Sequence, residues 1–395
     1  MCEKFVLVVS LFGFDVVSNS NSRTINIIKS LQENNDCIVK YVTTDFDHKK
    51  KVYKKIGDNA VNISYIHVPP YSENLSLKRI YSHIVFAMKL RKYLNELEEK
   101  PYVIYCAMPT STAAYMSGKY CKRYGIKFVI DVIDLWPDSL MPLTSFKKAL
   151  SLLTYPWKWI TIRSYKMANI IIGESRKYAR EASKYNPSVP VYPLYLGVDQ
   201  ELVNEIIAKH TLVLEKPENE IWIAYAGSLG TSYDFETLIR SISTLNNIID
   251  YKLWFVGNGV ARCAIEKMLQ KYCVNAEITG FLSYEHLLKY LSYCDIAINI
   301  FRKDTKVVHS YKFNDYVATQ CFILNSLEGE TADMIEEYQI GLNFDFEDNS
   351  LDKVLLECIS NWDKYHSWKI NNRRLVAELL DKRKIYSKIS SVLIE

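Results

Sequence analysis

Short apolar runs alternate with longer amphipathic segments along the whole chain. Runs of about four to eight apolar residues that end at turn residues are typical of buried strands, whereas apolar positions three and four residues apart are typical of helices. This alternation predicts βαβ units and parallel sheets. The expected strands are 5–12, 37–43, 61–67, 102–106, 128–132 and 170–173, then 221–226, 253–256, 277–279, 296–301, 322–325 and 342–344. Among the expected helices are 80–97, 111–124, 235–245, 261–272, 284–293 and 331–338.

The pattern and the length of 395 residues indicate two domains, since a domain typically has about 100–200 residues. We predict an α/β fold with two Rossmann-like, doubly wound parallel-sheet domains that face a cleft. Pro190, Pro193, Gly197 and a polar run at 215–220 predict the linker between them. The expected domains are 1–200 and 201–372, and a C-terminal helix within 373–395 is expected to cross back to the N-terminal domain. Such sheets bind ligands at the carboxyl ends of their strands, so the cleft is the expected site.

Composition excludes several classes of protein. No run reaches the roughly 18 apolar residues of a membrane-spanning helix, and the apolar run at 5–12 has no cleavage site, so we interpret it as a strand. The nine cysteines are scattered without a Cys-x-x-Cys pair, which is typical of reduced cysteine in a cytoplasmic protein. The seven histidines show no ligand spacing, so no metal site is expected.

Charge is distributed unevenly between the two halves. Residues 1–200 contain 28 Lys and Arg against 17 Asp and Glu, whereas residues 201–395 contain 21 against 28. A basic N-terminal half suits a phosphate-bearing acceptor or an anionic lipid surface. Ordinary solvated lysines are the alternative. The basic residues are dispersed and form no known binding motif, so nucleic acid is not an expected partner.

Two glycine turns in the second half predict a phosphate site. Gly227 and Gly230 lie between a predicted strand and a predicted helix, and Gly257 and Gly259 follow the next strand in the same way. Such turns let backbone N–H groups approach an anion, and a helix N-terminus adds roughly half a positive charge. The alternative is that these glycines only close strand–helix turns.

Six segments carry a resemblance to a known family. They are Asp131–Ser139, Tyr225–Gly230, Phe255–Gly259, Ile278–Leu282, Tyr290–Asp295 and Lys312–Tyr316. In their order and spacing, the chain resembles family 4 glycosyltransferases of the two-Rossmann GT-B type, in the subset that builds capsule and O-antigen polysaccharides. The resemblance covers about residues 6–393. It implies retaining transfer of a sugar from a nucleotide donor, usually UDP-linked, with no cofactor and no catalytic metal, because the nucleotide sugar is itself a substrate.

The resemblance also implies roles for residues of the second domain. Lys312 would offset the charge on the leaving diphosphate, although a solvated lysine at a helix start is the alternative. Asp315 occupies the position of the family's ribose-binding glutamate. The implied donor-binding residues are Gly227, Ser228, Gly230, Gly257, Gly259, Phe281, Leu282, Lys312 and Asp315.

Three departures from the family pattern bear on activity. Relatives carry an Arg and a Lys in the loop after the first glycine, but this chain has no cation between Gly227 and Asp234. Val307 replaces the first of two glutamates, and Gln320 replaces a glycine. A catalytically weak or inactive paralogue, which binds nucleotide sugar or scaffolds a partner, is therefore an alternative.

The acceptor is expected on the first domain and is either lipid-linked or a saccharide. Asp134 is the expected catalytic carboxylate and would position the acceptor, with a loop-anchoring aspartate as the alternative. Ile133 stands where many relatives have a histidine, so we expect the donor's own phosphate to take the acceptor proton. The expected acceptor-binding residues are Asn19, Ser20, Ser22, Arg23, Asp131 and Trp136.

The segment 146–163 mixes apolar residues, two tryptophans and four cations. That composition suits an interfacial helix on an anionic membrane, or else an ordinary amphipathic helix. The resemblance implies a cytoplasmic hexosyltransferase of surface polysaccharide synthesis, and an interfacial helix would add peripheral contact at the inner face of the cell membrane. A UDP-sugar 2-epimerase shares the two-sheet architecture and is the other enzyme considered. A nicotinamide dehydrogenase is disfavoured because no Gly-x-Gly-x-x-Gly follows the first strand.

Overall fold

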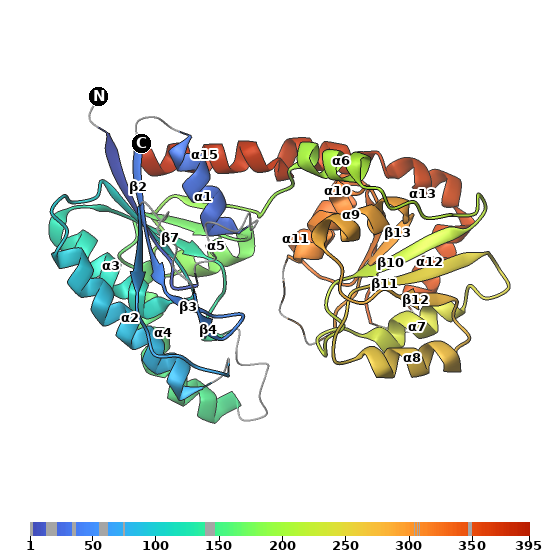
Figure 1. Cartoon of the computed structure of the whole chain (residues 1–395), viewed down its shortest axis with the longest axis horizontal. Coiled ribbons are helices and arrows are strands. Elements are labelled where there is room, and N and C mark those ends of the chain that lie inside the picture. Colours follow the sequence, from blue (N-terminus) through green and yellow to red (C-terminus); the bar gives the residue numbers. More distant parts are fainter. Residues whose placement is uncertain are drawn as a thin grey trace. The chain divides into compact units, whose positions relative to one another are not determined.

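The computed structural model describes residues 3–12, 22–33, 37–54, 62–73, 76–138, 147–303, 305, 307, 309–346 and 350–395, and the side chains among them except those of 147–153. The chain divides into two compact units. Unit 1 comprises Met1–Leu196 and Arg383–Glu395, and unit 2 comprises Gly197–Lys382. Each unit is a parallel sheet with helices on both faces (Figure 1).

The sheet of unit 1 has seven parallel strands in the order β5-β2-β1-β6-β7-β8-β9. Alternate residues of each strand face opposite layers, so Leu7 and Val9 lie in one core and Val6 and Val8 in the other. The strands are β1 (Lys4–Val9), β2 (Cys37–Thr44), β5 (Ile63–Ile66), β6 (Val103–Ala107), β7 (Lys127–Val132), β8 (Ile170–Gly173) and β9 (Val191–Pro193), with a small antiparallel pair β3 (Phe46–Asp47) and β4 (Val52–Tyr53) beside them.

Two helical layers cover this sheet. Phe86 and Leu90 pack one layer onto the first core, and Ile25 and Ile389 pack the other layer onto the second core. The first layer contains α2 (Leu77–Asn95), α3 (Ser111–Tyr124) and α4 (Lys147–Tyr165), with α5 (Arg176–Ser183) beside α4. The second contains α1 (Arg23–Gln32) and the C-terminal α15 (Lys382–Ile394).

Unit 2 has six parallel strands in the order β12-β11-β10-β13-β14-β15. They are β10 (Ile221–Ala226), β11 (Tyr251–Val256), β12 (Ala276–Ile278), β13 (Ile296–Asn299), β14 (Phe322–Asn325) and β15 (Gly341–Asn343). The helices are α6 (Gln200–Lys209), α7 (Phe235–Ser243), α8 (Arg262–Lys271), α9 (Tyr284–Tyr293), α10 (Tyr311–Ala318), α11 (Glu330–Tyr338), α12 (Ser350–Ser360), α13 (Trp362–Trp368) and α14 (Asn371–Leu375). Two doubly wound parallel sheets confirm the expected fold class.

The C-terminal helix is interrupted where a single helix was expected. A π-helical turn over Val376–Leu380 leads to Asp381, which is extended, and α15 begins at the next residue. Val198 stabilises the break, because its N–H donates to Leu380 O at 2.7 Å and its carbonyl accepts from Lys382 N at 3.1 Å. Beyond the break, α15 buries Ile389 in the core of unit 1, so the chain does cross back to the first unit.

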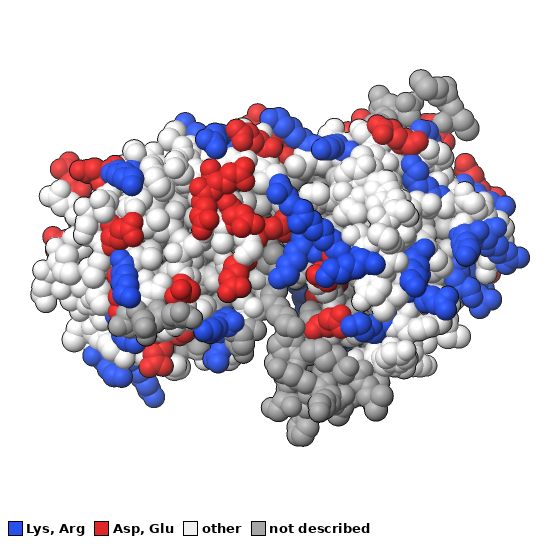
Figure 2. Space-filling view, turned by 180° about the vertical axis from the view of Figure 1, so that it is seen from behind, with Lys and Arg blue, Asp and Glu red and all other residues white. Residues whose placement is uncertain are grey.

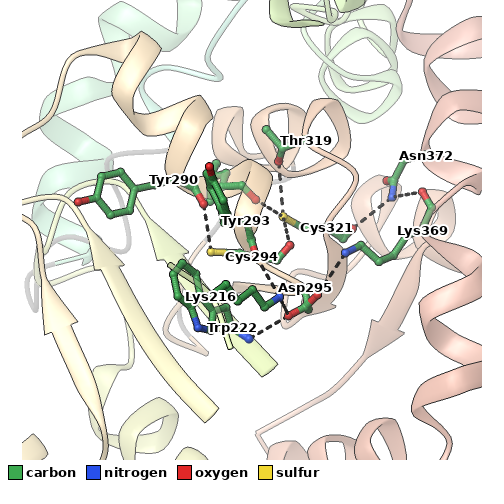
Figure 3. Close-up of polar contacts among 11 residues, drawn as sticks. Lys216, Trp222, Tyr290, Tyr293, Cys294, Asp295, Thr319, Cys321, Lys369 and Asn372 are labelled. Carbon is green, nitrogen blue, oxygen red and sulfur yellow. Dashed lines mark hydrogen bonds and ion pairs between the residues drawn. The ribbon is translucent and has the colours of Figure 1, made fainter. Parts of the chain in front are cut away.

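Asp295 joins three parts of unit 2 at the amino ends of its strands (Figure 3). Its carboxylate pairs with Lys216 of the segment before β10, accepts Trp222 N–H at 2.9 Å, and lies 3.5 Å from Lys369 Nζ after α13. Ligands of such sheets bind at the opposite, carboxyl edge. The aspartate that ends the family-like segment Tyr290–Asp295 therefore has a structural role here.

Candidate functional site

The two glycine turns of unit 2 pack against each other at the carboxyl edge of the sheet. Gly227 N–H donates to Val256 O at 2.9 Å, and Leu229 N–H donates to Asn258 O at 3.0 Å. A Cβ on Gly257 would collide with Gly227 O, and one on Gly259 would collide with Leu229 O. Gly257 and Gly259 are therefore needed for the close packing of the turns.

The first turn has an open side as well. No heavy atom lies within 4 Å of a Cβ built on Gly227, which has φ +128°, and at Gly230 the nearest such atom is 3.5 Å away. Within the described residues, the N–H groups of Ser228 and Gly230 donate no hydrogen bond. Unused N–H groups at an open glycine turn are suited to bind phosphate oxygens.

The helix that follows this turn does not supply the expected positive end. Asp234 caps α7, because its carboxylate accepts Thr237 N–H at 3.1 Å and the Thr237 hydroxyl at 2.8 Å, and Glu236 lies in the first turn. These negative charges already offset the helix dipole. By contrast, α10 has no side-chain cap from Ser310 and no acidic residue in its first turn. The positive end of α10 is therefore available to an anion, as is that of α8, which also has no side-chain cap and no acidic residue in its first turn.

Lys312 lies in this first turn of α10, with its amine inside an aromatic cage. Lys312 Nζ is 4.2 Å from the ring centre of Tyr225, 3.9 Å from that of Tyr233 and 4.7 Å from that of Phe301. The amine is buried and has no hydrogen-bond partner in the described part of the chain. Burial lowers the pKa of Lys312 well below its ordinary value. Burying an amine without a hydrogen-bond partner costs free energy, so this position indicates a ligand that would accept a hydrogen bond from the amine.

Tyr225 brings the cage and the glycine turn together. Its hydroxyl donates to Ser228 O at 2.8 Å, while its ring faces Lys312. The fold therefore places Lys312 beside the turn of Gly227, Ser228 and Gly230, although more than 80 residues separate them in sequence. The two tyrosines of the cage are the residues that sequence reasoning missed. A sequence feature that could have indicated them is that Tyr225, which has a hydroxyl, occupies a core-facing position at the end of a strand, next to the glycine turn.

Asp315 lies one turn along α10 and accepts a hydrogen bond from the Tyr284 hydroxyl at 3.0 Å. Burial raises the pKa of Asp315 to about 7, and the hydrogen bond from Tyr284 opposes this shift. Tyr284 begins α9 directly after the segment that contains Phe281 and Leu282, and the Phe281 ring is exposed. The residues implied for base and ribose contact thus lie in neighbouring segments.

Two basic residues lie near the loop between Gly227 and Asp234, which contains no Lys or Arg. Arg302 and Lys303 follow β13 and line a cavity of about 600 Å³ together with Asp234, Arg240 and Asp345. Lys306, the next cation along the chain, lies outside the described residues. The cavity lies beside the capped start of α7, so these cations do not replace a cation within the glycine turn itself.

In unit 1, two of the expected acceptor residues form a buried ion pair. Arg23 Nε and Nη2 donate to the Asp131 carboxylate at 2.5 and 2.6 Å, and Arg23 also donates to Leu194 O. The Tyr105 hydroxyl donates to the same carboxylate. Ser22 caps α1 by accepting Ile25 N–H at 3.3 Å. This geometry gives Arg23, Asp131 and Ser22 structural contacts, and their acceptor role stays a prediction.

Asp134 and Trp136 lie at the carboxyl end of β7, beside a cationic and aromatic cluster. The Trp136 ring centre is 4.2 Å from the Arg79 guanidinium carbon, and Asp134 accepts its neighbour's N–H, that of Leu135, at 2.7 Å. His83 is fully buried, and neither ring nitrogen has a hydrogen-bond partner among the described residues. Burial, followed by the charge of Arg79, lowers the pKa of His83 to about 3.

Arg79 and His83 were not expected from the sequence. They are four residues apart on the core-facing side of α2, where apolar side chains are the rule, so two polar side chains at these positions could have indicated a buried polar cluster. Asn19 and Ser20 lie outside the described residues.

No described helix is both long and apolar enough to cross a membrane. No group of three or more His, Cys, Asp and Glu side chains is placed to hold a metal ion in the part of the chain that the structure describes.

No protein-family model matches the chain, and no curated protein matches it in sequence. Solved structures do match over almost the whole length. Sucrose-phosphate synthase from Thermosynechococcus elongatus aligns with a TM-score of 0.70 at 13% identity, covering 99% of this chain and 98% of that chain. HepE of Anabaena in complex with UDP aligns with a TM-score of 0.67 at 11% identity, covering 99% of each chain.

Two further matches bear on the enzyme class. WaaG, a glycosyltransferase involved in lipopolysaccharide biosynthesis, aligns with a TM-score of 0.64 at 13% identity, covering 98% of this chain and 99% of that chain. A protein assigned as a UDP-N-acetylglucosamine 2-epimerase, from Listeria monocytogenes, aligns with a TM-score of 0.59 at 9% identity, covering 98% and 95%. At such identities the likeness is one of fold. The two parallel-sheet units and these neighbours together show that the chain has the GT-B fold.

Proposed function

We propose that this chain is a glycosyltransferase that moves a hexose from a nucleotide-sugar donor, UDP-linked, to an acceptor hydroxyl with retention of anomeric configuration. The observation that carries the proposal is the buried, unpartnered amine of Lys312 beside the open turn at Gly227–Gly230. A diphosphate would accept hydrogen bonds from both the amine and the N–H groups of the turn. The GT-B fold and the UDP bound by the structural neighbour HepE add support.

The donor site is assigned to unit 2. The N–H groups of Ser228 and Gly230 bind the diphosphate, and the Lys312 ammonium neutralises it as the sugar leaves. The Asp315 carboxylate accepts the ribose hydroxyls. Backbone groups of Phe281 and Leu282 contact the base edge.

The transfer step needs no group beyond the two substrates and these residues. The acceptor oxygen bonds to the anomeric carbon on the face from which the leaving group departs, as the bond from that carbon to the donor's phosphate oxygen breaks. The departing phosphate oxygen takes the proton of the acceptor hydroxyl. Lys312 stabilises the charge that develops on the diphosphate, which is the main electrostatic demand of the step. No cofactor and no catalytic metal enter this scheme.

The acceptor is assigned to unit 1, with Asp134 as the residue that positions it. A lipid-linked or saccharide acceptor in surface polysaccharide synthesis, at the inner face of the cell membrane, fits the basic N-terminal half. Asp134→Asn would lower turnover without changing the affinity for UDP. Unchanged turnover in a folded variant would remove Asp134 from the mechanism.

A specific observation favours a second candidate, a weak or inactive paralogue that binds nucleotide sugar. No cation lies between Gly227 and Asp234, and the Asp234 carboxylate adds negative charge at the end of this loop. The 2-epimerase finds less support, because its structural match is weaker than those to the transferases.

Thermal unfolding with UDP, GDP or NAD tests the nucleotide, and UDP release from UDP-hexoses in the presence of a cell-envelope extract tests the transfer. We expect UDP to raise the melting temperature and the extract to stimulate UDP release. Binding of UDP without release under any acceptor would favour the paralogue. Absence of any shift with UDP or GDP would reject both candidates.

A further inference from the structure

Helix α2 exposes a continuous apolar row to solvent. Leu77, Tyr81, Ile84 and Met88 are 79%, 59%, 42% and 64% exposed. Spacings of four, three and four residues place them on one stripe of the helix. The opposite side of α2 packs in the core of unit 1 through Phe86, Leu90 and Leu94. No described residue buries this second apolar stripe, and an exposed apolar patch on a protein surface marks an interaction site.

The charged residues within α2 all have one sign. Residues 76–95 contain no Asp or Glu and five Lys and Arg. The neighbouring helices α3 and α4 contain no acidic residue either, and α3 packs between α2 and α4 in one layer (Figure 1). Twelve basic residues lie on the three helices: Lys78, Arg79, Lys89, Arg91, Lys92, Lys119, Lys122, Arg123, Lys147, Lys148, Lys158 and Arg163.

Helix α4 adds exposed aromatic rings to this layer. Tyr155 is 65% exposed and Trp159 is 44% exposed, and Arg163 lies 5.0 Å from the Trp159 ring centre. Tyrosine and tryptophan are enriched at membrane interfaces, where one end of the ring is apolar and the other wet. Trp157 instead faces inward and donates to Ser111 Oγ at 3.2 Å, so only part of the segment 146–163 is available to a surface.

We propose that the helical layer α2–α3–α4 docks on an anionic membrane, with the row Leu77, Tyr81, Ile84 and Met88 entering the headgroup region. Charge complementarity selects this occupant. The three helices contain no carboxylate. Arg79 is buried, and Lys92 and Lys158 pair with Glu96 and Asp138, but Lys78, Lys89 and Arg91 are exposed beside the row. Cations beside an apolar stripe are the composition of interfacial helices, which bind lipid phosphates. On the face seen in Figure 2, Lys and Arg cluster on unit 1 and Asp and Glu form a band on unit 2, as the uneven charge of the two halves of the sequence leads one to expect. The inference does not rest on the proposed function, since an inactive chain would bind lipid equally.

Vesicle co-sedimentation of the full chain tests the proposal. Vesicles of phosphatidylcholine alone are compared with vesicles that also contain phosphatidylglycerol. We expect the chain to sediment with the anionic vesicles, to remain in solution with the neutral ones, and to dissociate as salt is raised. A chain that remains in solution with both would overturn the proposal.

Two sets of variants assign the binding to α2. Leu77→Ser/Tyr81→Ser/Met88→Ser removes most of the row, and Lys78→Glu/Arg91→Glu reverses two exposed charges. Each is expected to lower partitioning into anionic vesicles by at least about tenfold. All these side chains are exposed, and circular dichroism checks that the fold is kept.

Matched controls on α8 of unit 2 are Lys267→Glu/Lys271→Glu, and Val260→Ser just before that helix, a side chain that is 84% exposed. These controls are expected to partition like the wild type. Equal partitioning of the α2 variants and the wild type would contradict the assignment. Light scattering without vesicles addresses the other occupant: self-association that the row variant abolishes, with no lipid binding, would show that a second copy covers this face.

Discussion

Replacing Lys312 by methionine separates the stability of unit 2 from its ability to bind a donor. Methionine has nearly the length of lysine but no amine, so it fills the cage of Tyr225, Tyr233 and Phe301 without a buried polar group. In most proteins the loss of a buried charged group is harmful because its partner is left behind. Within the described residues, this amine has no hydrogen-bond partner to leave.

The expected effect on stability follows from two opposing contributions. A buried polar group without a partner costs about 1–3 kcal/mol, and attraction of an ammonium to aromatic rings returns about 0.5–2 kcal/mol. Burial lowers the pKa of Lys312 well below its ordinary value, and the attraction to the rings falls as the amine loses its charge. We therefore expect Lys312→Met to stabilise the free protein by about 1 kcal/mol, or about 2–4 °C for a domain of this size.

Scanning calorimetry with and without UDP measures both halves of the expectation. The variant should melt higher than the wild type without ligand, whereas UDP should raise the melting temperature of the wild type and leave that of the variant nearly unchanged. Lys267→Met, on the exposed surface of α8, is the matched control and should behave like the wild type.

Two results would refute this reasoning. Destabilisation of the variant by more than about 1 kcal/mol would mean that the amine contributes net stability through its ring contacts. An equal UDP shift in variant and wild type would mean that Lys312 does not contact the nucleotide.

Further predictions concern protonation and packing. Burial lowers the pKa of Lys312 and a bound diphosphate would raise it, so UDP should bind with proton uptake, and UDP affinity should fall as pH rises from the pKa of the free protein to that of the complex. Titration calorimetry in buffers of different ionisation enthalpy detects the proton uptake, and a binding heat that does not depend on the buffer would contradict it. With its pKa raised to about 7, Asp315 becomes protonated as pH falls below 7, so UDP affinity should also drop there, and Asp315→Asn should lose this dependence. Gly259→Ala should destabilise unit 2 because its Cβ would collide with Leu229 O, whereas Gly230→Ala has room for a Cβ and should keep stability but weaken UDP binding. A larger loss of stability in urea for Gly230→Ala than for Gly259→Ala would reject the packing argument. Asp131→Ala strands a buried guanidinium and should cost about 3–5 kcal/mol in urea unfolding without changing UDP affinity, and a near-neutral change would contradict the buried pair.

The fold was accessible from the sequence because its signals are local. Buried strands such as Ile221–Ala226 are uninterrupted apolar runs, and glycine turns follow them within a few residues. The break before α15 was not accessible, since neither proline nor glycine lies at Asp381. The hydrogen bonds that stabilise it come from Val198, far away in the chain.

The site was accessible only in part, for the same reason. The resemblance to a known family implied a role for Lys312 beside the glycine turn, but the cage that buries the amine is formed by the rings of Tyr225, Tyr233 and Phe301, which no sequence pattern indicated. The ion pair of Arg23 with Asp131 joins residues 108 positions apart. A charged residue near an expected cleft does not reveal from sequence whether it faces a ligand or another side chain.

The most direct test of the account is a crystal structure of the chain with UDP. We expect the pyrophosphoryl group to accept hydrogen bonds from the N–H groups of Ser228 and Gly230 and from the Lys312 amine. Clear UDP density at another place, or an empty turn at saturating UDP, would contradict the central claim.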